Sequence, residues 1–372
     1  MLNGAQRRIS MRLEEARISI DGPQACDPKV LSRKFYNKVC WGGSLALGET
    51  YMDGLWECDA LDDFFYRLLT ADVEHCARFS LQELLSTARS CLVNLQTVRR
   101  AFQIAERHYD LGEDMFTLML GPTMAYTCAY WKCATTLCDA QYAKFDLICR
   151  KLQLQKGESL LDIGCGWGTF AKYAAETYGV KVLGVTVSEQ QAAFAQGLCS
   201  GLDVEIRVQD YRSVDERFDK ISTVGMLEHV GAKNYRTYMQ VVRRCLKEGG
   251  LSLLHTIGRL DTAQSLDPWI EKYIFPDGML PSLKQITASA EGLFVIEDLH
   301  NFGADYDRTL LAWLQNFEEA WPRLKDSFGE RFRRMWRYYL LSCAGAFRAR
   351  NIQLWQLVFS ENGVRDGYIP VR

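Results

Sequence analysis

The chain has 372 residues, 48% of them hydrophobic and 24% charged, with a formal net charge of −2 at pH 7. This length allows two or more domains with a substantial core, and the charge balance argues against a protein that coats nucleic acid. No apolar run approaches the roughly 18 residues of a membrane span, and residues 1–20 lack the apolar stretch of a secretory signal. Thirteen cysteines without a C-x-x-C pair favour reduced thiols in a cytosolic protein over a metal site.

Residues 1–90 have the pattern of a smaller N-terminal domain built from mixed short elements. Glycines at 42, 43 and 48 predict an early loop, and apolar residues at helical spacing predict an amphipathic helix over 59–70. A further helix is expected over 80–107, so that residues 91–108 form a helical linker to the larger part of the chain, residues 109–372.

From Ser159 onward, apolar strand-like runs alternate with helix-length segments. Such alternation implies a mostly parallel sheet with helices on both faces. The fold class predicted here is therefore α/β, Rossmann-like, with seven strands. The expected strands cover residues 160–163, 180–187, 204–208, 221–224, 251–254, 294–300 and 352–359.

A long helical stretch, residues 309–350, lies between the last two expected strands and is rich in aromatic residues and arginine. A connection of this length does more than close a sheet. We interpret it as a helical insertion that acts as a lid or binds the acceptor substrate.

The first strand of the sheet runs into a glycine-rich turn, Asp162-Ile163-Gly164-Cys165-Gly166-Trp167-Gly168. Because glycine has no Cβ, such a turn bends sharply and lets a ligand approach the backbone. The spacing G-x-G-x-G, with Asp162 ahead of it, differs from the dinucleotide fingerprint G-x-G-x-x-G. It resembles motif I of the methyltransferases that use S-adenosylmethionine (SAM), in which the loop faces the amino-acid part of SAM.

The loops after the next two strands supply further candidate SAM contacts, because ligands bind at the carboxyl ends of strands in open α/β sheets. The second strand is followed by Thr186 and Gln191, where many Rossmann-like proteins place an acidic residue for the ribose hydroxyls. After the third strand, Asp210 is placed to accept from the adenine amino group and Tyr211 to pack on the adenine face.

Six further segments give the resemblance its specificity. The chain resembles the bacterial cyclopropane-fatty-acyl-phospholipid synthase family over essentially its whole length, whereas the shorter mycolic acid cyclopropane synthases resemble only its catalytic half. The resemblance adds Tyr126 and Thr127 to the SAM-binding residues; the family usually has serine where Thr127 stands. The segments are Gly48–Trp56, His108–Gly112, Tyr126–Trp131, Gly225–Gly231, His255–Gly258 and Asn301–Tyr306.

This resemblance implies that a methylene group from SAM is added across a cis double bond of a phospholipid acyl chain. Such a reaction needs a dry pocket, aromatic faces to stabilise a cation, for which Tyr306, Phe302 and Trp131 are candidates, and a base. The family is similar to enzymes that hold a bicarbonate ion as this base. The residues carried over as its cage are Cys128, Glu228, His255, Tyr306 and the backbone at Ile257. Cys343 is a further candidate, for which we favour a packing role over a nucleophilic one.

The resemblance also implies partners. We expect a homodimer in the cytoplasm that touches the inner face of the cell membrane transiently, binds membrane phospholipids and binds no nucleic acid. The N-terminal domain, residues 1–90, is expected to engage the lipid. Basic side chains within 89–107 and 331–337 are candidates for contact with anionic headgroups.

Three alternatives stay open. One is a methyltransferase that acts on a small polar nucleophile, and the second forms a branched methyl or methylene product on lipid. The third is a lipid-binding protein with a degenerate SAM fold.

Overall fold

The computed structural model describes residues 4–71, 113–262 and 265–372. The predicted linker, the predicted helix over 80–107, its arginines and the segment His108–Gly112 lie outside the described residues. The chain divides into two compact units. In terms of described residues, the first unit comprises 4–71, 265–277 and 306–352, and the second comprises 113–262, 278–305 and 353–372.

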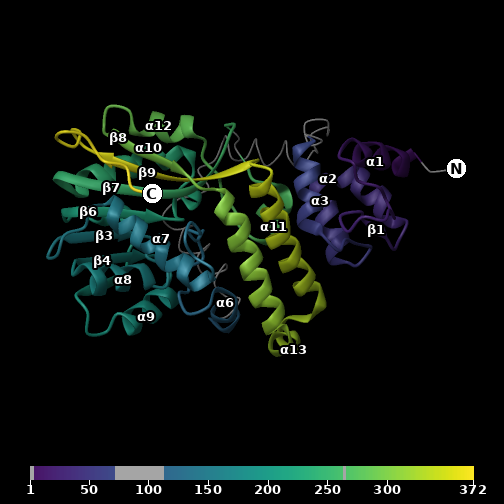
Figure 1. Ribbon diagram of the computed structural model, residues 1–372, viewed down its shortest axis with the longest axis horizontal. Coiled ribbons are helices and arrows are strands. Elements are labelled where there is room, and N and C mark those ends of the chain that lie inside the picture. The colour runs from purple at the N-terminus through teal and green to yellow at the C-terminus, as the bar shows by residue number, and fades with distance from the viewer. Residues whose placement is uncertain (1–3, 72–112, 263–264) are drawn as a thin grey trace. The chain divides into compact units, whose positions relative to one another are not determined.

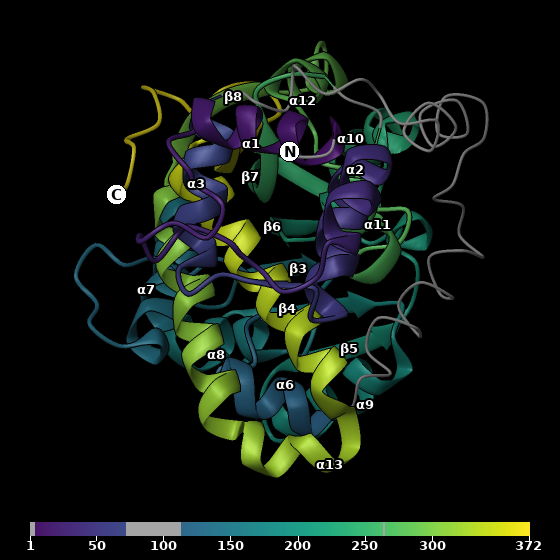
Figure 2. The same cartoon turned by 90° about the vertical axis from the view of Figure 1, so that its right-hand side faces the viewer.

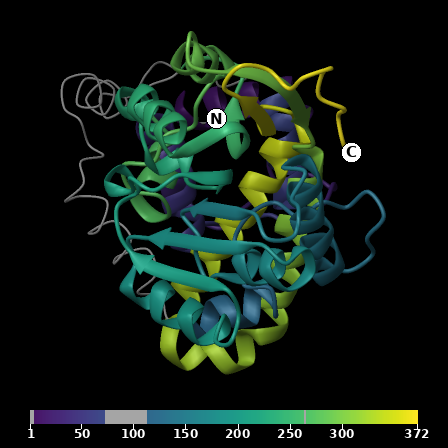
Figure 3. The same ribbon diagram turned by 90° about the vertical axis from the view of Figure 1, so that its left-hand side faces the viewer.

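The second unit contains the predicted seven-stranded sheet, in the order β5-β4-β3-β6-β7-β9-β8. Strands β5, β4, β3, β6 and β7 pair in parallel, and β8 pairs with β9 in antiparallel fashion. Figure 3 shows the teal arrows of the parallel strands side by side. The predicted fold class is confirmed. The strands are β3 Ser159–Ile163, β4 Lys181–Thr186, β5 Val204–Val208, β6 Phe218–Val224, β7 Leu246–Arg259, β8 Val295–Asn301 and β9 Ile352–Ser360.

Helices cover both faces of this sheet, as the continuous apolar runs of its strands require. Leu160 of β3 packs in a cluster with α7 and α8, whereas Leu161 and Ile163 pack in a second cluster with α10 and α12. Alternate side chains of one buried strand therefore serve opposite layers. Figure 1 labels these helices around β3, β4, β6 and β7. The helices of this unit are α6 Glu113–Leu120, α7 Leu137–Lys151, α8 Thr169–Tyr178, α9 Glu189–Leu198, α10 Tyr235–Cys245 and α12 Leu283–Ala290.

The first unit is mainly helical. The helix predicted over 59–70 is observed as α3. The loop predicted from the early glycines is wrong, because residues 34–52 form α2, a helix broken only at Gly43, whose φ of 55° is left-handed. Glycine tolerates this conformation, so the break leaves helical turns on both sides. The elements are α1 Gly4–Glu15, β1 Lys29–Val30, α2 Lys34–Met52, β2 Trp56–Glu57, α3 Leu61–Thr70, α11 Pro268–Tyr273 and α13 Ala304–Arg348.

The predicted long helical stretch is α13, which Gly329 divides into two parts with its φ of 69°. The two parts lie side by side and run in opposite directions, as Figure 2 shows. Glu318 of the first part binds both Arg333 and Arg337 of the second. Tyr338 joins α13 to the rest of the unit through rings 4.5 Å from Trp269 and 5.3 Å from Phe65.

The compact units thus divide the chain differently from the predicted domains, because α13 groups with the N-terminal segments. A close approach supports this grouping: a Cβ at Gly345 would lie 2.6 Å from the carbonyl oxygen of Asp62. Among the described helices, none combines the length and the apolar character that crossing a membrane requires.

Candidate active site

The glycine-rich turn follows β3 and leads into α8, and each of its three glycines has a positive φ, between 54° and 81°. The three differ in surroundings. A Cβ at Gly166 would meet no protein atom within 4 Å, whereas a Cβ at Gly168 would lie 2.6 Å from the Cβ of Ala195. Gly166 therefore leaves room for a ligand, and Gly168 allows α8 and α9 to pack closely.

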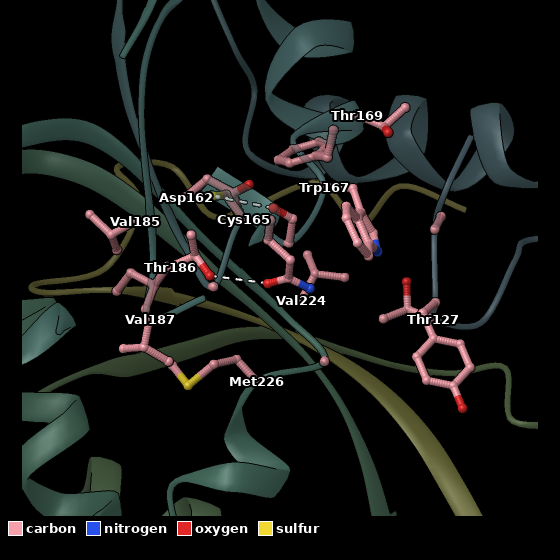
Figure 4. A pocket seen from close by; sticks show the side chains of 18 of the residues that line it. Thr127, Asp162, Cys165, Trp167, Thr169, Val185, Thr186, Val187, Val224 and Met226 are labelled. Carbon is pink, nitrogen blue, oxygen red and sulfur yellow. Dashed lines mark hydrogen bonds between the residues drawn. The ribbon is translucent and has the colours of Figure 1, made fainter. Parts of the chain in front are cut away.

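A cavity of about 230 Å³ opens beside this turn at the carboxyl ends of the strands. In Figure 4, Thr127 and Thr186 appear on opposite sides of the cavity, and Asp162, Cys165 and Trp167 appear between them. Of the ten predicted SAM-binding residues, Gly168 is not among the lining residues and instead forms the N-cap of α8. The other nine line the cavity: Tyr126, Thr127, Asp162, Gly164, Gly166, Thr186, Gln191, Asp210 and Tyr211.

Three of the predicted cofactor contacts, Thr186, Gln191 and Asp210, already have partners inside the protein. The Thr186 hydroxyl donates to Oε1 of Gln191 at 3.1 Å, so these two side chains act as one polar unit. Both carboxylate oxygens of Asp210 accept from the guanidinium of Arg212, at 2.8 and 2.7 Å. Asp210 thus has to serve any adenine amino group with its remaining lone pairs.

Asp162 and Lys144 are buried charged groups in the cavity wall. Asp162 is 2% exposed, and its Oδ1 accepts from the Ser222 hydroxyl at 2.8 Å. Lys144 is 1% exposed and donates to the hydroxyl of Thr127 at 2.8 Å. Burial disfavours both charged forms, so it raises the pKa of Asp162 to about 7 and lowers the pKa of Lys144 to about 7.

The sequence analysis missed Lys144. A signal for it exists in α7, where the buried positions Ala140, Gln141, Lys144 and Ile148 recur at helical spacing. Two polar residues on a buried stripe are unusual and indicate a task. Gln141 donates to the carbonyl oxygens of Ala125 and Thr127, at 3.3 and 2.9 Å. Gln141 and Lys144 of α7 therefore both hold the segment that contains Thr127.

Glu228 lies in the short 3₁₀ helix Leu227–His229 after β6. Its Oε1 accepts from the backbone N–H of Ile257 at 2.6 Å, which brings together two of the predicted catalytic positions. Its Oε2 is buried and has no hydrogen-bond partner in the described structure. Burial outweighs the opposing effect of hydrogen bonds from backbone groups and from the Thr256 side chain, and raises the pKa of Glu228 to about 7.

His255 lies on β7 and is 1% exposed. Its Nδ1 lies 3.2 Å from Nε2 of Gln356, while its Nε2 is buried and has no hydrogen-bond partner within the described ranges. The ring of Phe302 lies edge-on at 5.8 Å. Burial lowers the pKa of His255 well below its ordinary value, so the ring is neutral at physiological pH.

The remaining predicted residues fall into both units. In the second unit, Cys128 is fully buried, and the backbone of Trp131 donates to Asp305 at 2.7 Å. In the first unit, Tyr306 stacks on Phe347 with ring centroids 4.4 Å apart. Cys343 is also in the first unit, where burial raises the pKa of its thiol to about 12. That thiol stays protonated at neutral pH, which fits a packing role.

A mostly parallel seven-stranded sheet with this glycine turn is the fold of a SAM-dependent methyltransferase. The fold extends to distant members: coclaurine N-methyltransferase matches with a TM-score of 0.70 at 22% sequence identity over 84% of this chain and 98% of that one. The chain belongs to the mycolic acid cyclopropane synthetase family, whose family model matches residues 96–357.

Two relatives show how far the similarity extends. The chain is 54% identical to a cyclopropane-fatty-acyl-phospholipid synthase of Escherichia coli over 356 residues, which cover 95% of this chain and 93% of that protein. The solved cyclopropane synthase MmaA2 from Mycobacterium tuberculosis matches with a TM-score of 0.66 and 32% identity, over 72% of this chain and 99% of that one. A further match, CmaA1, was solved as a complex with SAH and CTAB; its TM-score is 0.65 at 32% identity, over 69% of this chain and 97% of that one. The chain is thus an enzyme of the cyclopropane-synthase type.

Proposed function

We propose that this enzyme transfers a methylene group from SAM to the cis double bond of unsaturated phospholipid acyl chains, forming a cyclopropane ring with bicarbonate as the general base. The substrate class rests on the similarity to the E. coli synthase over nearly the whole chain. The base is carried over from the family resemblance, and two buried atoms without a hydrogen-bond partner in the described structure, Glu228 Oε2 and His255 Nε2, support it.

The cavity beside the glycine turn fits SAM. Gly166 leaves its backbone open toward a ligand, and the Thr186–Gln191 pair offers hydroxyl and amide groups suited to ribose hydroxyls. Arg212 holds Asp210 and Tyr211 lies beside them, in the place expected for an adenine. These contacts support the assignment of the cofactor to this cavity.

The two unpartnered atoms fit an ion that both accepts and donates hydrogen bonds. Since an amide nitrogen only donates, Gln356 Nε2 makes His255 Nδ1 an acceptor and leaves the proton of the neutral ring on Nε2. His255 thus offers a donor, while Glu228 offers an acceptor at Oε2 in its ionised form, which predominates above its pKa of about 7. Bicarbonate matches this pair, because its hydroxyl donates and its other oxygens accept.

An exchangeable anion also suits the chemistry. The alkene attacks the sulfonium methyl group, a C–C bond forms as the C–S bond breaks, and positive charge develops on the acyl chain. When bound, SAM supplies the carbon and bicarbonate accepts the proton whose loss closes the ring. A protein carboxylate that touched this cation would itself be at risk of alkylation. In our proposal Glu228 instead accepts a hydrogen bond from the bicarbonate ion and does not contact the cation.

The chain's aromatic residues fit the other requirement, a wall that stabilises a cation without attacking it. Phe302 is buried against His255, and Trp131 is also buried. A role for Tyr306 in stabilising the cation stays a prediction.

We further propose that the enzyme is a cytoplasmic homodimer that contacts the membrane transiently through its N-terminal segments. The arginines of 331–337 are weaker candidates for this contact than the sequence implied, because they bind internal acceptors: Arg331 binds Asp53, Arg334 binds the Tyr51 carbonyl, and Glu318 holds the other two. Light scattering tests the dimer. Sedimentation with anionic liposomes tests the membrane contact, which undiminished binding after removal of residues 1–108 would contradict.

Product analysis tests the reaction. The protein is incubated with methyl-labelled SAM and vesicles of an unsaturated phospholipid, and the fatty acids are analysed by mass spectrometry. We expect a gain of one CH₂ with loss of the alkene and with one label per product. A methyl-branched chain, or no transfer at all, would overturn the proposal.

A further inference from the structure

Lys144 is a buried lysine in the wall of the SAM cavity that the chemistry above does not use, and its pKa of about 7 leaves it partly charged at neutral pH. Its Nζ donates to Thr127 Oγ1 at 2.8 Å and lies 4.6 Å from the centre of the Phe145 ring. Among the described residues, no carboxylate oxygen comes within 4.0 Å of this ammonium group. Asp162 acts on this charge only from beyond that distance, so the protein compensates the charge incompletely, which points to an anion that arrives with the ligand.

The hydroxyl of Thr127 stands between this charge and the cavity. Since the oxygen of Thr127 accepts from Lys144, its own hydrogen remains to be donated. The Thr127 methyl group packs against Gly225, where a Cβ would lie 2.5 Å from Cγ2, and Gln141 fixes the carbonyl group of the same residue at 2.9 Å. The hydroxyl is therefore held in one orientation, and a charged donor behind it strengthens the bond it donates.

The same cavity carries the opposite charge as well. Asp162 lines it and is held by Ser222. A buried cation and a buried carboxylate in one wall complement a zwitterion, and the amino-acid end of SAM carries a carboxylate and an ammonium group.

We propose that Lys144 recognises the carboxylate of the methionine part of SAM, acting through the hydroxyl of Thr127. This inference rests on the SAM site of the proposed function. Lys144 is thus a positioning residue, whose charge sets which ligands the cavity prefers, and it takes no part in the transfer of the methylene group.

Two ligands separate this role from a structural one: SAM and decarboxylated SAM, which differ only in the carboxylate. Isothermal titration calorimetry measures the Kd of both for the full-length wild type and for Lys144→Met, which keeps the length of the side chain. We expect the Kd of SAM to rise about tenfold or more in Lys144→Met. The Kd of decarboxylated SAM should change less than about twofold, because that ligand never used the charge.

A second pair of variants keeps the test decisive if Lys144→Met does not fold. Thr127→Val removes the hydroxyl and should also abolish the preference for the carboxylate, whereas Thr127→Ser should keep it. An equal loss of affinity for both ligands would show a merely structural role and overturn the inference, as would an unchanged preference. Because the experiment measures binding directly, its result does not depend on which lipid product is formed. A wild type that prefers SAM over decarboxylated SAM but forms no cyclopropane would refute the proposed function and leave the inference about Lys144 intact.

Discussion

Gln356 donates from Nε2 to Nδ1 of His255 across 3.2 Å, and both side chains are buried. This contact determines which nitrogen of the neutral ring carries the proton and so makes Nε2 a donor. The sequence analysis gave His255 a catalytic role but gave none to Gln356, which lies 101 residues away on β9. The pair makes the histidine a fixed hydrogen-bond donor in an apolar setting.

Replacing Gln356 tests whether that contact matters. Gln356→Leu leaves Nδ1 unsatisfied and favours the other tautomer, so the KM for bicarbonate should rise about tenfold, in line with the loss of one buried hydrogen bond of roughly 1–3 kcal/mol. Initial rates at varied bicarbonate measure it. Gln353→Leu, on the same strand but bonded to Asn301, is the matched control and should leave this KM unchanged. Equal effects of the two variants would contradict the tautomer argument.

Glu228 should make stability depend on pH. Its pKa is about 7 in the folded protein against an ordinary 4.5, so the folded state binds the extra proton between these values. The stability that this proton provides is fully present below pH 4.5 and is lost as the pH rises through 7. Glu228→Gln lacks this titration, and without bicarbonate it should gain roughly 1–3 kcal/mol over the wild type between about pH 5 and pH 8. Urea unfolding across that range measures the gap, and a gap independent of pH would refute the assignment.

Two glycines of one turn should respond differently to alanine. Gly166→Ala points a methyl group into open space and should weaken SAM binding about tenfold, with about 1 kcal/mol of backbone strain. Gly168→Ala meets Ala195 and should cost roughly 1–3 kcal/mol of folding stability beyond that strain. Calorimetry and thermal unfolding separate the two effects. The same profile for both variants would mean that the division of roles is wrong.

Cys343 should prove dispensable for chemistry. Its thiol stays protonated because its pKa is about 12, so Cys343→Ala should keep kcat within about twofold and lower the stability by roughly 1–2 kcal/mol. Steady-state kinetics beside thermal unfolding give both values. A loss of kcat of a hundredfold in a folded variant would restore a catalytic role.

Much of the fold was predictable because its signals are local. Apolar runs marked all seven strands, and the spacing of Gly164, Gly166 and Gly168 marked the turn that forms one edge of the cavity. A glycine in the sequence does not by itself indicate a turn, however. In α2, Gly43 breaks the helix without ending it, and Gly48 packs against Trp269.

What stayed hidden depends on side-chain contacts that form only in the folded chain. Lys144 reads as an exposed lysine of a helix until Thr127 is placed beside it, and Asp210 reads as a free acceptor until Arg212 is seen to bind both of its oxygens. Helical spacing places Lys144 on a buried stripe but does not show its contact with Thr127, and the contact between Asp210 and Arg212 depends on the local turn conformation. The aromatic insertion was predicted, but its grouping with the N-terminal segments depends on packing at Tyr338 and Gly345.

The central claim is that Glu228 and His255 hold an exchangeable bicarbonate base. The most direct measurement is the rate of cyclopropane formation in rigorously CO₂-free buffer, before and after bicarbonate is added, for the wild type and for Glu228→Gln. The account predicts that the wild-type rate falls in CO₂-free buffer and recovers in a saturable way with bicarbonate, and that Glu228→Gln recovers far less. A wild-type rate that is indifferent to bicarbonate would contradict it.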